Sequence, residues 1–263
     1  MGKIMSFENG WAALNLEFPE KLPRTEYSVQ YYHWDLLKNV TGIDTAITEN
    51  RPEATRLFLK KWDFSMNWRV LVSTPDLEAA GVPVTKLGHA EFAGDGNDFD
   101  NEVKLAFEDP DEAVKLDPTT FKVWDEKELI ARFESSWQEG VAECDQLVNM
   151  SGTYVTLFSG LIAIFGIEML LMLLGLYPEE TGEIAAKYSQ WIRQYFRAFA
   201  ASRVPVMMVH DDLCWTSGPV TSPAWYRKHI FPHLKANIEI VKLILSNTGK
   251  SEDLIVHVKD RPG

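Results

Sequence analysis

Cysteine is scarce in this sequence, with only Cys144 and Cys214 among 263 residues. A disulfide framework needs more cysteines at closer spacing, so we expect a protein of a reducing, cytoplasmic compartment. The first residues, MGKIMSFENGW, lack the apolar run of a secretory signal. No G-x-G-x-x-G pattern and no phosphate loop occurs, which removes the main support for a dinucleotide-binding fold.

Positive charge is also in short supply. The chain has 26 Lys and Arg against 38 Asp and Glu, a formal net charge of −12. Residues 89–145 hold 17 of the acidic residues and 5 of the basic ones, so this segment accounts for the whole net charge. An acidic field repels phosphate backbones and anionic lipid, so we expect neither nucleic acid nor a membrane as partner. A solvated acidic face explains the segment most simply.

One apolar run is long enough to test as a membrane span. It covers residues 157–176 and contains a single charged residue, Glu168. A carboxylate near the middle of a span is costly, and Ser159 and Gly160 interrupt the run. We therefore expect a buried helix of a globular domain. Glu168 would then be a buried carboxylate that needs a partner, or that stabilises the Gly-containing turn.

Helix and strand patterns alternate along the chain. Apolar spacing predicts a helix over about 126–145, and Pro178 and the Ser222–Pro223 pair are typical helix starts. Short runs rich in β-branched residues predict parallel strands at 69–73, 153–158, 204–209 and 254–258. Alternation of this kind predicts an α/β fold, and we favour a TIM (β/α)8-type barrel in one domain, 1–263. Residues 74–125 are expected to form an acidic excursion of loops and short helices.

Three polar residues, His210, Asp211 and Asp212, directly follow the predicted strand at 204–209. The carboxyl ends of barrel strands face the active-site mouth, so these residues are candidate catalytic groups. Adjacent side chains on an extended chain point in opposite directions, so one Asp can face a pocket and orient a substrate or accept a proton. The alternative is structural: both Asp residues cap the following turn or pair with a nearby Arg.

Four stretches, in order, resemble the uroporphyrinogen decarboxylase superfamily, which includes corrinoid-linked methyltransferases. The first two are WAALNLEFPEKLPRTEY, similar to its opening helix and first strand turn, and FEDPDEAVKLDP, similar to an acidic run ending in Asp-Pro. The third, TYVTLFSGLIAIFGIEMLLMLLGLYPEE, is similar to its central strand, Gly-rich turn and helix. The fourth, VPVMMVHDDLCWTSGPVTSPAWYRKHIFPHLK, is the closest match.

This resemblance implies a TIM barrel with a pocket at the carboxyl ends of its strands. About five or six strands can be counted, and a barrel needs eight, so we expect a barrel incomplete at its carboxyl terminus. Tyr154 either lines this pocket or packs in the core, and we favour packing. Together with Glu168, and with His257 and Arg24, which lie near family positions, it is a candidate substrate-binding residue. The decarboxylase of this family carries an N-terminal arginine pair that holds substrate carboxylates. This sequence has Arg24 near that region but no second arginine in the same pattern. His257, with Cys214, is the weak candidate for zinc, although Lys259 stands where some relatives have a cysteine.

Three functions follow as hypotheses. The resemblance favours a corrinoid-linked methyltransferase or O-demethylase, acting on a small molecule, with zinc and a corrinoid carried by a partner protein as the implied cofactors. The alternative is uroporphyrinogen decarboxylase of haem biosynthesis, a lyase that needs no cofactor. The third is a non-catalytic barrel fragment, or a homo-oligomer that covers open sheet edges.

Overall fold

The computed structural model describes residues 6–25, 29, 31–86, 90–92, 98–100, 104–215, 217–247 and 256–258. Its α-helices are α1 (Ser6–Leu14), α2 (Trp34–Thr41), α3 (Arg51–Lys61), α4 (Thr74–Ala79), α5 (Pro110–Ala113), α6 (Glu126–Glu143), α7 (Phe158–Phe165), α8 (Ile167–Leu176), α9 (Pro178–Ala201), α10 (Pro223–His229) and α11 (Phe231–Asn247). Its strands are β1 (Met66–Val72), β2 (Ala90–Phe92), β3 (Asp98–Asp100), β4 (Val148–Thr153), β5 (Met207–Val209), β6 (Cys214–Trp215), β7 (Gly218–Pro219) and β8 (Val256–Val258).

The central sheet is parallel and its strands follow one another in chain order, β1-β4-β5-β8. A further parallel bridge joins Thr25 to Met66, at the start of β1. The protein is therefore a mixed α/β protein, as the alternating pattern predicts. Within the part of the chain that the structure describes, the sheet is open and does not close into an eight-stranded barrel.

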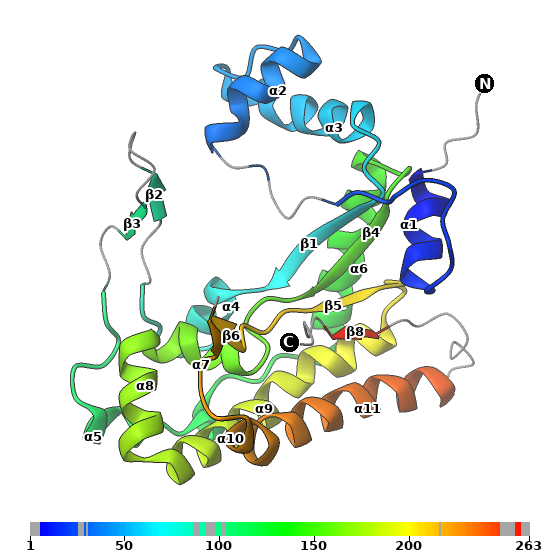
Figure 1. The fold of residues 1–263 in the computed structure, drawn as a ribbon. Coiled ribbons are helices and arrows are strands. Elements are labelled where there is room, and N and C mark those ends of the chain that lie inside the picture. Colours follow the sequence, from blue (N-terminus) through cyan, green and yellow to red (C-terminus); the bar gives the residue numbers. More distant parts are fainter. Residues whose placement is uncertain are drawn as a thin grey trace.

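Helices cover one face of the sheet. The long helices α9 and α11 run side by side beneath it, and α6 packs on β1 and β4 (Figure 1). The largest apolar core lies here, where Val72, Met207 and Val209 of the strands meet Leu129 and Phe133 of α6. The opposite face carries a smaller cluster, built by Trp68, Val148, Met150 and Val206, on which Trp11 of α1 packs.

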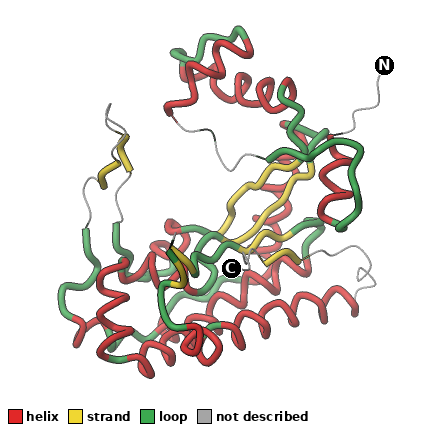
Figure 2. The backbone as a smooth tube through the Cα atoms, in the orientation of Figure 1, coloured by secondary structure: helices red, strands yellow, loops and turns green. Residues whose placement is uncertain are grey.

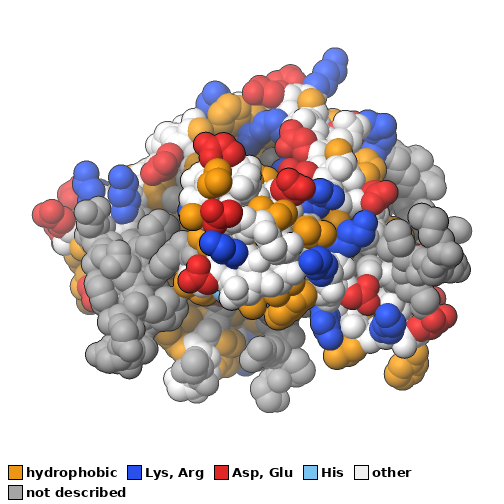
Figure 3. All heavy atoms as spheres, turned by 90° about the horizontal axis from the view of Figure 1, so that it is seen from above, with side chains coloured by type: hydrophobic (Ala, Val, Ile, Leu, Met, Phe, Trp, Pro, Cys, Tyr) orange, Lys and Arg blue, Asp and Glu red, His pale blue; other side chains and the backbone are white. Residues whose placement is uncertain are grey.

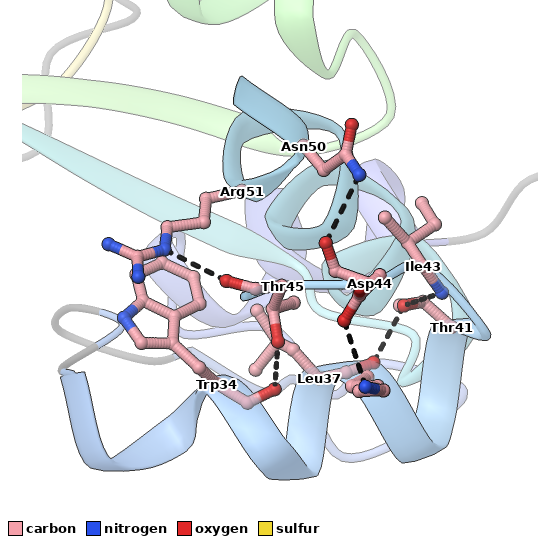
Figure 4. Close-up of polar contacts among 9 residues, drawn as sticks. Trp34, Leu37, Thr41, Ile43, Asp44, Thr45, Asn50 and Arg51 are labelled. Atoms are coloured by element: carbon pink, nitrogen blue, oxygen red, sulfur yellow. Dashed lines mark hydrogen bonds and ion pairs between the residues drawn. The ribbon is translucent and has the colours of Figure 1, made fainter. Parts of the chain in front are cut away.

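Helices α2 and α3 form a separate unit at one end of the sheet (Figures 1 and 2). Their own core is completed by Cys144 and Leu147, which lie between α6 and β4. The turn between the two helices is held by polar contacts (Figure 4): the Thr45 hydroxyl donates to the Trp34 carbonyl, and Arg51 Nε donates to the Thr45 carbonyl. The Arg51 guanidinium also lies over the Trp34 ring, 4.9 Å from its centre.

Several predicted elements are confirmed. Helix α6 occupies Glu126–Glu143, within the predicted range, and α9 begins at Pro178. The Ser222 side chain accepts a hydrogen bond from the Trp225 N–H, so it caps α10. The strand predicted at 69–73 is part of β1, and those at 204–209 and 254–258 contain β5 and β8.

The strand predicted at 153–158 is misplaced, because β4 covers Val148–Thr153. The true strand contains Asn149, Ser151 and Gly152, so it does not look like an apolar run. The Asn149 amide donates to the Cys144 and Leu147 carbonyls, which allows a polar side chain to be fully buried. At Gly152 a Cβ atom would lie 1.8 Å from the Met208 carbonyl oxygen, so only glycine fits.

The apolar run 157–176 is two helices, not one. Helices α7 and α8 meet at Gly166 with a bend of 108°, and Gly166 has the positive φ of 72° that ends α7. Within the described ranges no single helix has the length and apolar character to cross a membrane, and this bent pair passes that test only when its two halves are taken together. Glu168 is exposed on α8, so the prediction of a buried carboxylate is wrong.

Candidate active site

Tyr154 and His210 lie side by side at the carboxyl end of the sheet. Each directly follows its strand, and the last residues of β4 and β5, Thr153 and Val209, are paired in register. The Tyr154 ring stacks on the His210 imidazole, with centres 4.2 Å apart and an interplanar angle of 12°. The Trp68 ring from β1 lies 6.2 Å from both rings. Three neighbouring strands thus build one aromatic cluster around a histidine.

The orientation of His210 follows from its two polar contacts. Its Nδ1 lies 3.1 Å from the Tyr154 carbonyl oxygen, and because a carbonyl only accepts, Nδ1 carries a proton. Its Nε2 lies 3.4 Å from Asp212 Oδ1. The His210 side chain is 18% exposed and that of Asp212 is 63% exposed, so the pair connects the aromatic cluster to solvent.

Burial and charge act in opposite directions on His210. Burial lowers its pKa, whereas the bond to Asp212, the negative charge of Asp212 and the Tyr154 carbonyl raise it, and the net result is a raised pKa. His210 is therefore protonated over more of the neutral range than a free histidine. A protonated imidazole with a carboxylate behind it can donate a proton to a substrate and take it back.

Asp211 has a different place from its neighbour. Its Oδ1 accepts a hydrogen bond from the Ser159 N–H, 2.6 Å away, in the first turn of α7. The Ser159 hydroxyl in turn accepts from the Asp212 N–H at 2.7 Å. Asp211 therefore caps the start of α7 and ties this helix to the loop that carries His210.

Asp211 does act as a cap, but it does not cap the turn that follows it in the chain, as the structural alternative for Asp211 and Asp212 expected. The helix that Asp211 caps precedes it by some fifty residues in the chain. The two carboxylates nevertheless diverge as expected from alternating side chains, with Asp211 turned inward and Asp212 outward.

The carboxyl group of Asp211 is strongly affected by its surroundings. Its Oδ2 is buried, and no residue in the described ranges makes a hydrogen bond to it. Burial raises the pKa of Asp211 from 3.8 to about 6, while the N–H groups of Ser159, Phe158 and Leu157 limit the increase. Through its bond to Ser159, Asp211 positions the loop that carries His210 and Asp212.

Three other predicted site residues, Arg24, Glu168 and Cys214, do not join this cluster. Arg24 precedes the bridge to the start of β1, so it lies at the amino end of the sheet. Exposed Glu168 lies on α8, and Cys214 is exposed on β6. The backbone of His257 in β8 pairs with Met208, but its side chain lies outside the described residues.

A zinc site needs three or four ligands close together. The described part of the chain contains no group of three or more His, Cys, Asp or Glu side chains placed to hold a metal ion. The residues that the structure describes therefore do not fit the zinc that the resemblance implies.

Sequence reasoning missed two members of the site, Trp68 and Ser159. Trp68 lies just outside the predicted strand at 69–73, and extending that strand by one residue would have included it. Ser159 carried no signal of its own, because its role depends on a loop far away in sequence.

A scan against models of known protein families finds no match, and a search of curated proteins finds no significant one.

Proposed function

We propose that this protein is an enzyme of the uroporphyrinogen decarboxylase superfamily and that its sheet is one arc of a TIM barrel. The strand order supports this proposal. Strands follow chain order around a TIM barrel, whereas the order reverses part-way in doubly wound folds. Here four strands lie in chain order, and the Thr25 bridge would precede them in the same order.

The proposed active site lies at the carboxyl end of this arc, where substrates bind in such barrels. The observation that carries the proposal is the His210–Asp212 pair, 3.4 Å apart, beside the stacked Tyr154 ring. The Tyr154 carbonyl holds the imidazole in one tautomer, and Asp212 stabilises its protonated form. The partly exposed Tyr154 ring offers an apolar surface for a small substrate, and His210 acts as the general acid.

The proposed reaction is methyl transfer from a small methylated substrate to a corrinoid held by a partner protein. The corrinoid, when bound, would supply the nucleophile for the methyl group. When the carbon–heteroatom bond breaks, the electron pair stays on the heteroatom, which takes a proton from His210 Nε2. His210 is then protonated again from solvent through its exposed edge near Asp212. The resemblance favours this branch, since no second arginine accompanies Arg24 for a substrate with many carboxylates.

The test is methyl transfer to reduced cobalamin with a panel of methoxy, methylamine and methylthiol compounds. His210→Gln is expected to lower the rate by about a hundredfold, the usual contribution of a general acid. Asp212→Asn should move the pH profile toward lower pH, because His210 loses the group that raises its pKa. Asp35→Asn is the matched control: it removes one negative charge, as Asp212→Asn does, at an exposed position on α2. It should leave the rate unchanged. Absence of transfer from every compound would refute this reaction.

Decarboxylation of uroporphyrinogen is the second candidate, and the exposed carboxylate of Asp212 next to His210 favours it. Such a reaction needs a proton donor and a carboxylate that stabilises the protonated pyrrole, and this pair provides both. Loss of acetate carboxyl groups from uroporphyrinogen would be measured in the wild type and in Asp212→Asn. Decarboxylation that is unchanged in Asp212→Asn would exclude this carboxylate from the mechanism.

A further inference from the structure

A second pocket lies at the amino end of β1, away from the candidate active site. It has a volume of about 580 Å³ and is lined by Lys21, Leu22, Arg24, Lys61, Trp62 and Asp63. Clefts of this size are typical of small-molecule sites. Tyr154 bonds to Val72 at the other end of β1, so the seven residues of this strand separate the two sites by about 20 Å.

The pocket is positively charged in a protein of net charge −12. Three of its lining residues are cationic, and among the described lining residues the only acid is Asp63. Asp63 Oδ2 lies 3.4 Å from Lys21 Nζ, and Asp63 Oδ1 accepts a hydrogen bond from the Ser6 hydroxyl. About two positive charges therefore remain without an acidic partner in this lining.

The two remaining cations are held in place by main-chain carbonyls. Arg24 Nη1 donates to the Trp62 carbonyl at 3.2 Å, and Lys61 Nζ donates to the Val40 carbonyl at 2.9 Å. These contacts fix the positions of the charges without neutralising them. The Arg24 contact also covers a carbonyl at the end of α3, which would otherwise repel an anion.

An aromatic ring and an aliphatic side chain complete the pocket. Trp62 is 39% exposed and packs against Phe58, with ring centres 4.7 Å apart, so the ring is supported from the core side. Leu22 is 87% exposed on the facing loop. Figure 3 views the molecule from above, where Lys and Arg, Asp and Glu, and hydrophobic side chains are interspersed.

We propose that this pocket binds a small anionic ligand with a ring next to its phosphate or carboxylate group. The ring would lie against Trp62, and the anionic group would contact Arg24 and Lys61. Arg is suited to planar anions through paired hydrogen bonds, and Lys supplies a compact charge. The inference is independent of the proposed function, because binding is measured directly and needs no catalytic activity.

The experiment is calorimetric titration of the full chain with phenyl phosphate, benzoate, inorganic phosphate and benzyl alcohol. We expect saturable binding of phenyl phosphate or benzoate, weaker binding of inorganic phosphate and none of the neutral alcohol. Arg24→Gln and Lys61→Gln should each weaken binding by about tenfold, which corresponds to about 1.4 kcal/mol. Trp62→Ala should remove the preference for phenyl phosphate over inorganic phosphate.

Lys60→Gln is the matched control, because Lys60 is an exposed neighbour on α3 that does not line the pocket. It makes the same change in net charge and should leave binding within a factor of about two. Thermal unfolding would verify that each variant is folded, and Lys61→Gln keeps the test valid if Arg24→Gln is unstable. No saturable binding by the wild type, or equal weakening by Lys60→Gln and Lys61→Gln, would overturn the proposal.

Discussion

Replacement of Asp211 by Asn should change how the stability of this protein depends on pH. Burial raises the pKa of this carboxyl from 3.8 to about 6. Each pKa unit corresponds to about 1.4 kcal/mol, so ionisation of Asp211 destabilises the folded state by about 3 kcal/mol relative to the unfolded chain. Because the folded protein binds the proton more tightly, this loss begins near pH 4 and is complete above about pH 6.

Asparagine has nearly the same shape and is neutral at every pH. Its side-chain oxygen can still accept the Ser159 N–H bond that Asp211 accepts at 2.6 Å. We therefore expect the free energy of unfolding of Asp211→Asn, relative to the wild type, to increase by about 3 kcal/mol between pH 4 and pH 7.5. Urea unfolding followed by circular dichroism, repeated across this pH range, would measure the difference.

The comparison with wild type is what isolates Asp211, because other groups titrate equally in both proteins. Asp35→Asn, at an exposed position on α2, should show a difference near zero at every pH. A difference for Asp211→Asn that is independent of pH, or that falls as pH rises, would refute the reasoning. It would mean that the attraction between the carboxylate and the first N–H groups of α7 outweighs the cost of burial.

Three further changes test the packing. Gly152→Ala should destabilise the protein by about 3 kcal/mol or more in chemical unfolding, because the new Cβ would overlap the β5 backbone. Arg132→Gln should cost about 2–3 kcal/mol, since it removes the ion-pair partner of buried Asp76, and a loss below about 0.5 kcal/mol would contradict this. Tyr188→Phe should cost about 1–2 kcal/mol in thermal unfolding, because the buried Val155 carbonyl loses its hydrogen bond.

Local patterns were sufficient to predict several helices in the second half of the chain. The start of α9 at Pro178 and the cap of α10 at Ser222 depend on residues within one helical turn, so the sequence states them directly. The bend at Gly166 also has a local cause, its positive φ, but a long apolar run concealed it. Glu168 was expected to be buried for the same reason, and the bend turns it outward to solvent.

The sheet was harder to predict because its requirements are not local. Strand β4 contains the buried Asn149, whose amide donates to backbone carbonyls, and Gly152 is needed only because β5 approaches so closely. Neither feature resembles the continuous apolar run expected of a buried parallel strand. The strand was therefore predicted at residues 153–158, which do form such a run, and not at Val148–Thr153.

The candidate active site divides in the same way. The position of His210 and Asp212 after an apolar strand could be predicted from the sequence, because both belong to one short segment. Their environment could not, since the Tyr154 and Trp68 rings come from two other strands, and Ser159 joins Asp211 across fifty-two residues. Short-range order supplies the chemical groups, whereas the pKa of each depends on burial and on neighbours that meet only when the chain folds.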